Sequence, residues 1–318
     1  KELIKVLCLT VAIATIGCTE ETKEDPRYDS GISRELAEWR KATISNLSYK
    51  LHFDLPAERS EAVDGSVAIC FTMAEAEEVI IDFREPASSI TSIEVNGIVH
   101  DYRAENEHII IPRTATVAGE NCISIAFRAG DQSLNRNDDF LYTLLVPDRA
   151  RTLFPVFDQP DLKATFELSL SLPEEWVAVS NSGVRSSTKA DGRQHIEFHP
   201  TEPLSTYLFS FVAGALNVAT YHETDPERIA QIDEIFRQVV ASLEWLEEYT
   251  GVAYPFAKYD LVMLPGFQYG GMEHTGATLY NAGQMFLGDN PTLDEELRRT
   301  QLIAHETAHM WFGDYVTM

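Results

Sequence analysis

The sequence TLDEELRRTQLIAHETAHMWFG, residues 292–313, predicts the helix on which the C-terminal part of the fold depends. Thr292 and Glu295 fit a capping box, in which each side chain accepts a hydrogen bond from the other residue's backbone N–H. We expect the helix to continue to about Phe312, because Gly313 is a residue type that ends helices. At helical spacing, Trp311 and Phe312 are both expected in the core.

The same helix carries the pattern HExxH at His305, Glu306 and His309. Imidazoles at i and i+4 are about 6 Å apart along a helix axis, so both point the same way and can bind one Zn²⁺. Glu306 lies on the flank of that face, where it can deprotonate water without being a ligand. Taken alone, the pattern also fits a helix with two partly exposed histidines and a salt-bridging glutamate.

A Gly-rich segment upstream contains Gly270, Gly271, Met272, Glu273 and His274. Glycines lack a Cβ and let another backbone approach closely, as a strand edge that receives a peptide would require. Glu273 could hold a cation. Taken alone, the segment favours a Gly-rich turn with a surface carboxylate.

Alternating polar and apolar residues predict an all-β region from residue 45 to about 215. The alternation is strict from Leu47 to Leu55, and similar runs begin at Val67, Ile123 and Phe166. Asn96-Gly97 predicts a tight hairpin, because both residues tolerate positive φ.

Helical patterns flank this region. Residues 33–44 predict a short helix with Ser33 as its cap. A longer helix is expected to begin at Asp225-Pro226 and to end at Gly251, before a short strand over 259–264.

Composition narrows the class of protein. The 318 residues include 25 basic and 50 acidic side chains, and the formal net charge is −25. This balance argues against a nucleic-acid partner, because neutralising phosphates requires a basic surface. Hydrophobic residues make up 44% and charged residues 24%, which is typical of a folded globular body, here of about two domains.

GGMEH followed by HETAHMWFGD resembles the aminopeptidase N family of gluzincin zinc metallopeptidases. Residues 154–161, FPVFDQPD, are similar to that family's segment FPCFDEPD, and the resemblance covers roughly residues 45–318. It implies a multidomain β + α/β fold. An all-β, saddle-like domain over 45–216 would precede the start of a thermolysin-like catalytic domain over 217–318.

The resemblance also implies a role for each site residue. His305 and His309 would bind one zinc ion, and Glu306 would be the general base that takes a proton from the zinc-bound water. Glu273 would bind the free α-amino group of a peptide substrate, while Gly270, Gly271 and Met272 would line the peptide's path. The implied reaction is removal of N-terminal residues from peptides.

The match departs from the family pattern at several points, and the most important concerns the metal ligands. The family's third zinc ligand is a glutamate on a following helix and is expected beyond residue 318. We therefore expect the chain as given to bind zinc weakly and to be catalytically inactive. A different reading is a non-catalytic scaffold or binding protein with a degenerate peptidase domain. An endopeptidase is disfavoured, because Glu273 has no obvious role there.

The N-terminal residues suggest export. Lys1 and Lys5 flank the apolar run 6–16, which is too short to span a bilayer and suits a signal peptide over residues 1–17. Thr15-Ile16-Gly17-Cys18 resembles a bacterial lipobox, in which Cys18 would be lipidated. Residues 18–44 would then be a tether and short helix, and the protein would be lipid-anchored at a membrane of the bacterial cell envelope. The other reading is a buried or fraying N-terminal helix.

Cys70 and Cys122 each lie in a strand-like run. Two buried free thiols are the first expectation, and a disulfide in an oxidising compartment remains open.

Overall fold

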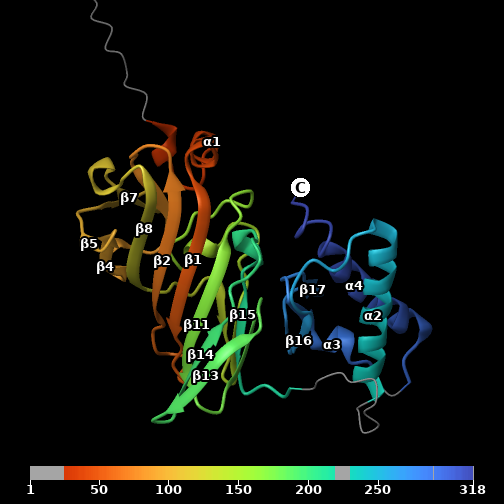
Figure 1. Ribbon diagram of the computed structural model, residues 1–318. Coiled ribbons are helices and arrows are strands. Elements are labelled where there is room, and N and C mark those ends of the chain that lie inside the picture. The colour runs from red at the N-terminus through yellow and green to blue at the C-terminus, as the bar shows by residue number, and fades with distance from the viewer. Residues whose placement is uncertain (1–24, 219–229, 289, 318) are drawn as a thin grey trace, which may run out of the picture.

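The computed structural model describes residues 25–218, 230–288 and 290–317. Figure 1 shows a β-rich N-terminal part and a C-terminal part in which helices pack on a small sheet. The predicted signal peptide, Cys18 and the predicted Asp225-Pro226 cap lie outside the described residues. No helix of the described residues is both long and apolar enough to cross a membrane.

Strict alternation produces the largest sheet. Its eight strands lie in the order β13 (Val184–Ala190), β14 (Arg193–Phe198), β11 (Thr165–Pro173), β1 (Ser45–Asp54), β2 (Asp64–Met73), β8 (Gly119–Arg128), β4 (Ile90–Val95) and β5 (Ile98–Val99). The β1–β11 pair is parallel and the other pairs are antiparallel. Leu51 lies opposite both Val67 and Leu168, so the apolar residues of neighbouring strands share one face.

Smaller sheets and one helix complete this part. One sheet has the order β12 (Val177–Ser180), β15 (Phe211–Gly214), β10 (Phe140–Thr143) and β9 (Leu134–Arg136), and the other has the order β3 (Val79–Asp82), β7 (His108–Ile111) and β6 (Arg103–Glu105). Short 3₁₀ turns are η1 (Pro26–Tyr28), η2 (Ala87–Ser89), η3 (Arg113–Ala115), η4 (Ala150–Thr152) and η5 (Thr206–Leu208). Helix α1 (Arg34–Thr43) begins at Ser33, whose side chain accepts from the Leu36 N–H, as predicted.

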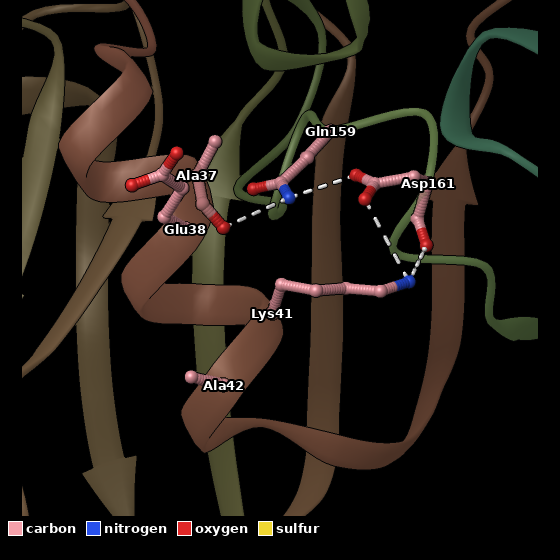
Figure 2. Close-up of a pocket in the computed structure, with 6 residues that line it drawn as sticks. All are labelled: Ala37, Glu38, Lys41, Ala42, Gln159 and Asp161. Carbon is pink, nitrogen blue, oxygen red and sulfur yellow. Dashed lines mark hydrogen bonds and ion pairs between the residues drawn. The ribbon is translucent and has the colours of Figure 1, made fainter.

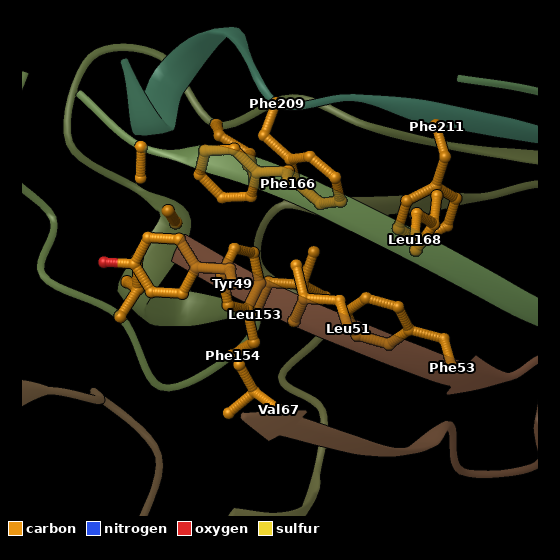
Figure 3. Close-up of a cluster of buried hydrophobic side chains, with 14 of the residues drawn as sticks. Tyr49, Leu51, Phe53, Val67, Leu153, Phe154, Phe166, Leu168, Phe209 and Phe211 are labelled. Atoms are coloured by element: carbon orange, nitrogen blue, oxygen red, sulfur yellow. The ribbon is translucent and has the colours of Figure 1, made fainter. Parts of the chain in front are cut away.

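The core of the β-rich part lies between the sheets and is rich in aromatic rings (Figure 3). Tyr49 stacks on Phe166 with ring centres 4.8 Å apart, and Phe166 stacks on Phe209 at 4.9 Å. Rings packed in this way add to the stabilisation from buried apolar area. The large sheet is thereby joined firmly to the sheet that contains β15.

The segment 154–161 has a structural role. Phe154 and Phe157 are fully buried, and the Asp158 carboxylate accepts hydrogen bonds from the Arg151 N–H at 3.1 Å and the Thr206 hydroxyl at 2.8 Å. Burial raises the pKa of Asp158 to about 6, although these hydrogen bonds oppose the shift. The residues of this segment that resemble the family motif therefore contribute to the packing of the β-rich part.

The hairpin between β4 and β5 confirms the turn prediction. Asn96 has φ +54° and Gly97 has φ +79°, as a type I′ turn requires.

We expect Gly97→Ala to lower the free energy of unfolding by about 1 kcal/mol, because a Cβ disfavours positive φ. Urea unfolding will measure the change. The control Gly183→Ala, where no atom lies within 4 Å of an added Cβ, should leave stability unchanged or slightly higher. Equal losses in both variants would contradict the prediction.

The expectation of two buried free thiols is wrong. Cys70 and Cys122 lie directly opposite each other on β2 and β8 and form a disulfide, with their Cα atoms 4.1 Å apart. Both residues are only partly buried, since they alternate with the core residues of their strands. The sequence alone could not reveal this pairing, because it depends on the register of two strands.

The C-terminal part follows with helix α2 (Ala230–Thr250), β16 (Asp260–Leu264), β17 (Gly271–Met272), β18 (Ala277–Asn281), α3 (Ala282–Met285) and α4 (Leu293–His309). The strand order is β16-β18-β17, with β16 parallel and β17 antiparallel to β18. Helix α2 ends before Gly251 at φ +67°, as predicted. Its buried residues Ile235 and Val239 pack in one cluster with Ile303 of α4.

Helix α4 has the predicted capping box at Thr292 and Glu295 but ends at His309, before the expected Phe312. Directly after His309 the backbone forms 3₁₀-type turns, because the N–H groups of Met310 and Trp311 donate to the carbonyls three residues back, at 3.2 and 3.1 Å. Of the two residues expected in the core, Trp311 is buried and Phe312 is half exposed. The early end of the helix turns Phe312 outward.

Contacts between the two parts position the small sheet. The Asn181 side-chain amide donates to the Thr275 carbonyl at 2.9 Å, and the Lys163 ammonium donates to the Asp314 carbonyl at 2.7 Å. Met272 and Leu279 of the small sheet belong to the core of the β-rich part. One continuous core therefore holds β17 and β18 in place.

Candidate metal centre

Helix α4 brings the imidazoles of His305 and His309 together. Their Nε2 atoms lie 3.2 Å apart, and the ring centres lie 4.7 Å apart with perpendicular planes. The Nδ1 atom of His309 lies 3.2 Å from the Phe312 carbonyl oxygen and can donate to it, which leaves the Nε2 lone pair free. Two nitrogen ligands of a tetrahedral zinc ion, each about 2.0–2.1 Å from the metal, are about 3.3 Å apart. The observed separation therefore fits a shared zinc ion.

Glu306 lies beside these rings and is buried, with 3% of its surface exposed. Burial raises the pKa of Glu306 to about 8, and the nearby charge of Glu273 adds to the shift. A carboxylate with a pKa near neutrality is suited to accept a proton during a reaction.

Glu273 approaches from β17 and its following turn. One carboxylate oxygen lies 3.8 Å from His309 Nδ1, and its side chain is 17% exposed. Glu273, Glu306 and His309 offer ligand atoms that all lie within 4.8 Å of one another. The structure thus brings the Gly-rich segment and the HExxH helix into one site.

Gly271 explains how the two segments come so close. A Cβ built on Gly271 would overlap the Glu306 carboxylate, whereas one on Gly270 would meet two flexible side-chain ends, Leu302 Cδ1 at 3.1 Å and Gln284 Oε1 at 3.3 Å. Among the described residues, β17 is an edge strand, so one side of its backbone is available for pairing. Met272 is buried in the core, so only its backbone can line a peptide's path.

Sequence reasoning missed Asp314 and Tyr207 near this site. Asp314 is buried, and neither of its carboxylate oxygens has a hydrogen-bond partner among the described residues. Burial, followed by the charge of Glu273, raises the pKa of Asp314 well above its usual range. Asp314 and Glu273 also contribute to the raised pKa of Tyr207, after burial. Asp314 could have been noticed in the sequence because it directly follows Gly313, the residue expected to end the HExxH helix. No local pattern in the sequence marks Tyr207.

His274 follows Glu273 and is completely buried, and neither ring nitrogen has a hydrogen-bond partner among the described residues. Burial lowers the pKa of His274 to about 3, so the folded chain holds the neutral imidazole. Between pH 6.5 and 3 the unfolded chain binds a proton that the folded chain does not, so stability falls as the pH falls through this window.

We expect the loss of unfolding free energy from His274 to reach about 2 kcal/mol at pH 5, and His274→Leu should remove this contribution. Chemical denaturation at pH 7 and pH 5 measures it. His199→Leu, at an exposed histidine, is the matched control and should retain the full pH dependence. The assignment fails if His274→Leu retains it as well.

A separate hollow of about 350 Å³ lies between α1 and the loop 159–161 (Figure 2). The Gln159 amide donates to the Ala37 carbonyl at 3.1 Å and to the Asp161 carboxylate at 2.8 Å. Lys41 donates to the Asp161 carbonyl at 2.6 Å. Its main polar side chains bond one another, and no residue of the HExxH site lines it.

A β-rich part joined to a helix that carries paired histidines beside a buried glutamate is the arrangement expected of the family that the sequence resembles. The chain belongs to peptidase family M1: the family model for the Peptidase M1 N-terminal domain matches residues 45–208, and that for the Peptidase family M1 domain matches residues 235–318. The expected family and fold class are confirmed.

Individual relatives agree with this assignment. Aminopeptidase N of Streptomyces lividans is 30% identical over 91% of this chain and 36% of its own length. Endoplasmic reticulum aminopeptidase 1 of Homo sapiens is 26% identical over 99% and 37%, respectively. Aminopeptidase N of Acetobacter pasteurianus is 36% identical over 53% of this chain and 51% of its own. The chain thus spans little more than a third of the length of the first two relatives.

Proposed function

We propose that the protein is a zinc-dependent aminopeptidase that removes N-terminal residues from peptides. The observation that carries the proposal is the 3.2 Å separation of the His305 and His309 Nε2 atoms beside the buried Glu306. The relatives are named as aminopeptidases, and this supports the same reaction.

His305 and His309 would hold the zinc ion through Nε2. Zinc, when bound there, supplies a Lewis acid that polarises the scissile carbonyl and makes a water molecule more acidic. Because Glu306 would not bind the zinc ion, its carboxylate would be free to accept the proton from the attacking water. It then delivers that proton to the leaving amine.

Glu273 would select substrates with a free N-terminus. A carboxylate held at this depth favours a charged ammonium group over an internal amide, which is the physical basis of exopeptidase action. The unpaired side of β17 would bind the substrate backbone as an added strand.

The role of Glu273 predicts that Glu273→Gln loses selectivity for free N-termini. We expect kcat/KM for an aminoacyl anilide to fall about 30-fold, which corresponds to about 2 kcal/mol for loss of one partner of a partly buried ion pair. Hydrolysis of the N-acetylated anilide should not fall in parallel. A variant that keeps near-normal efficiency on the free amine would rule out the role.

Because the chain as given is expected to bind zinc weakly and to be inactive, the test of the whole proposal is metal-dependent release of N-terminal residues by a protein that also carries the third zinc ligand expected beyond residue 318. Zinc should bind with one ion per chain, removal by a chelator should abolish hydrolysis, and His309→Ala should weaken zinc binding by at least about tenfold. A protein that binds no zinc and releases no residue would favour the scaffold instead.

We further propose that the protein is exported and lipid-anchored in a bacterial cell envelope. The support is the lysine-flanked apolar run before Cys18. Metabolic labelling with a radioactive fatty acid, compared with Cys18→Ser, tests the anchor. Label that persists in the variant would disprove lipidation of Cys18.

A further inference from the structure

Two histidines meet on the face of the large sheet that is turned away from its core. His52 on β1 and His195 on β14 flank β11, and these three strands lie side by side (Figure 1). The ring centres are 5.6 Å apart, and the ring planes are tilted by 37°. Both side chains are partly exposed, so solvent and ions can reach them.

Serines on β11 hold both rings by Nδ1. The Ser169 hydroxyl lies 3.3 Å from the Leu51 carbonyl and donates to it, so it accepts from the His52 Nδ1–H at 3.0 Å. The Ser171 hydroxyl lies 3.3 Å from His195 Nδ1 in the equivalent position. Metal-binding histidines use their second ring nitrogen in this way, and the arrangement leaves the Nε2 lone pairs available.

One carboxylate lies beside the histidine pair. Glu197 Oε1 lies 3.9 Å from His195 Nε2, while Glu197 Oε2 accepts from Ser186 and Arg185. Burial, and then the neighbouring His195, lower the pKa of His52, so the neutral ring that binds metals predominates at pH 7.

The spacing of the rings suits one shared ion. Two imidazoles bound through nitrogens about 2.0–2.1 Å from one ion have ring centres about 4.5–5.5 Å apart. The 5.6 Å separation of the His52 and His195 ring centres lies just above this range. We propose that His52 and His195 bind one divalent transition-metal ion, with Glu197 as a nearby countercharge. Imidazole ligands suit Cu²⁺, Ni²⁺ and Zn²⁺, and Cu²⁺ should bind most tightly of these.

The test uses Cu²⁺ with the chain carrying His305→Ala and His309→Ala, so that the HExxH site does not contribute. Calorimetric titration at pH 7 should show one Cu²⁺ per chain. Adding His52→Ala or His195→Ala should weaken binding about 100-fold, the advantage that a second ligand fixed on the same sheet provides. Adding His199→Ala, at an exposed histidine of the same hairpin, should leave binding unchanged.

Spectroscopy and a conservative variant distinguish the loss of one copper ligand from a loss of folding. Electron paramagnetic resonance of the Cu²⁺-loaded chain should show two imidazole nitrogens, and His52→Gln should reduce them to one. Copper binding that survives both His52→Ala and His195→Ala, or falls equally in His199→Ala, would overturn the proposal. A spectrum with a single imidazole nitrogen before any change at His52 or His195 would overturn it as well.

Discussion

Glu306→Gln is expected to lower kcat by about a thousandfold, because proton transfer by a positioned side chain contributes about 10²–10⁴-fold to such reactions. Glutamine keeps the shape of the buried side chain but cannot accept the proton. Since the zinc ligands proposed on this helix are His305 and His309, and not Glu306, the metal content should not change. Initial rates on an aminoacyl anilide and metal analysis of the same preparation measure both quantities.

The comparison with His309→Ala separates the two roles. That variant should lose zinc and activity together, whereas Glu306→Gln should lose activity alone. If Glu306→Gln loses its zinc, the residue acts as a ligand, and if it retains more than about a tenth of the wild-type rate, it is not the general base.

Gly271→Ala is expected to lower kcat about 100-fold. The added Cβ would overlap the Glu306 carboxylate, and the backbone of Gly271 is held by its pairing with Tyr280 on β18. The carboxylate must therefore move, and a misplacement of about 1 Å in a catalytic group costs about 10²-fold. The same crowding should lower the free energy of unfolding by about 1–3 kcal/mol.

Gly270→Ala provides the matched control at the preceding residue. Its Cβ would meet the Leu302 side chain at 3.1 Å, and this flexible tip can shift by a few tenths of an ångström. We expect kcat to change by less than about threefold, because the added methyl group does not reach Glu306, and an effect of the place of Gly270 along the peptide's path would be seen in KM instead. Equal activity of the two variants would show that the close approach at Gly271 does not position Glu306.

Local features were the most predictable from the sequence. The capping box at Thr292, the Ser33 cap and the Asn96-Gly97 turn all occur as predicted, because each depends on neighbouring residues. The helix end near His309 was misplaced, since the turns that follow it form hydrogen bonds that the apolar pattern does not encode.

Contacts between distant segments were not predictable in this way. The disulfide of Cys70 and Cys122 depends on strand register, and the distance from Glu273 to His309 depends on how β17 packs beside α4. The family resemblance grouped the site residues, but it gave no distance between them and no burial for Glu306.

The sequence by itself determined that His305 and His309 lie on one face of a helix, because the spacing of i and i+4 residues is a property of the helix backbone. It also determined which strand faces are apolar. Only the tertiary structure decided that Gly271 leaves room for Glu306 and that Asp314 is buried near Glu273. These relations arise when separate elements pack on one core, and packing combines residues that no local pattern connects.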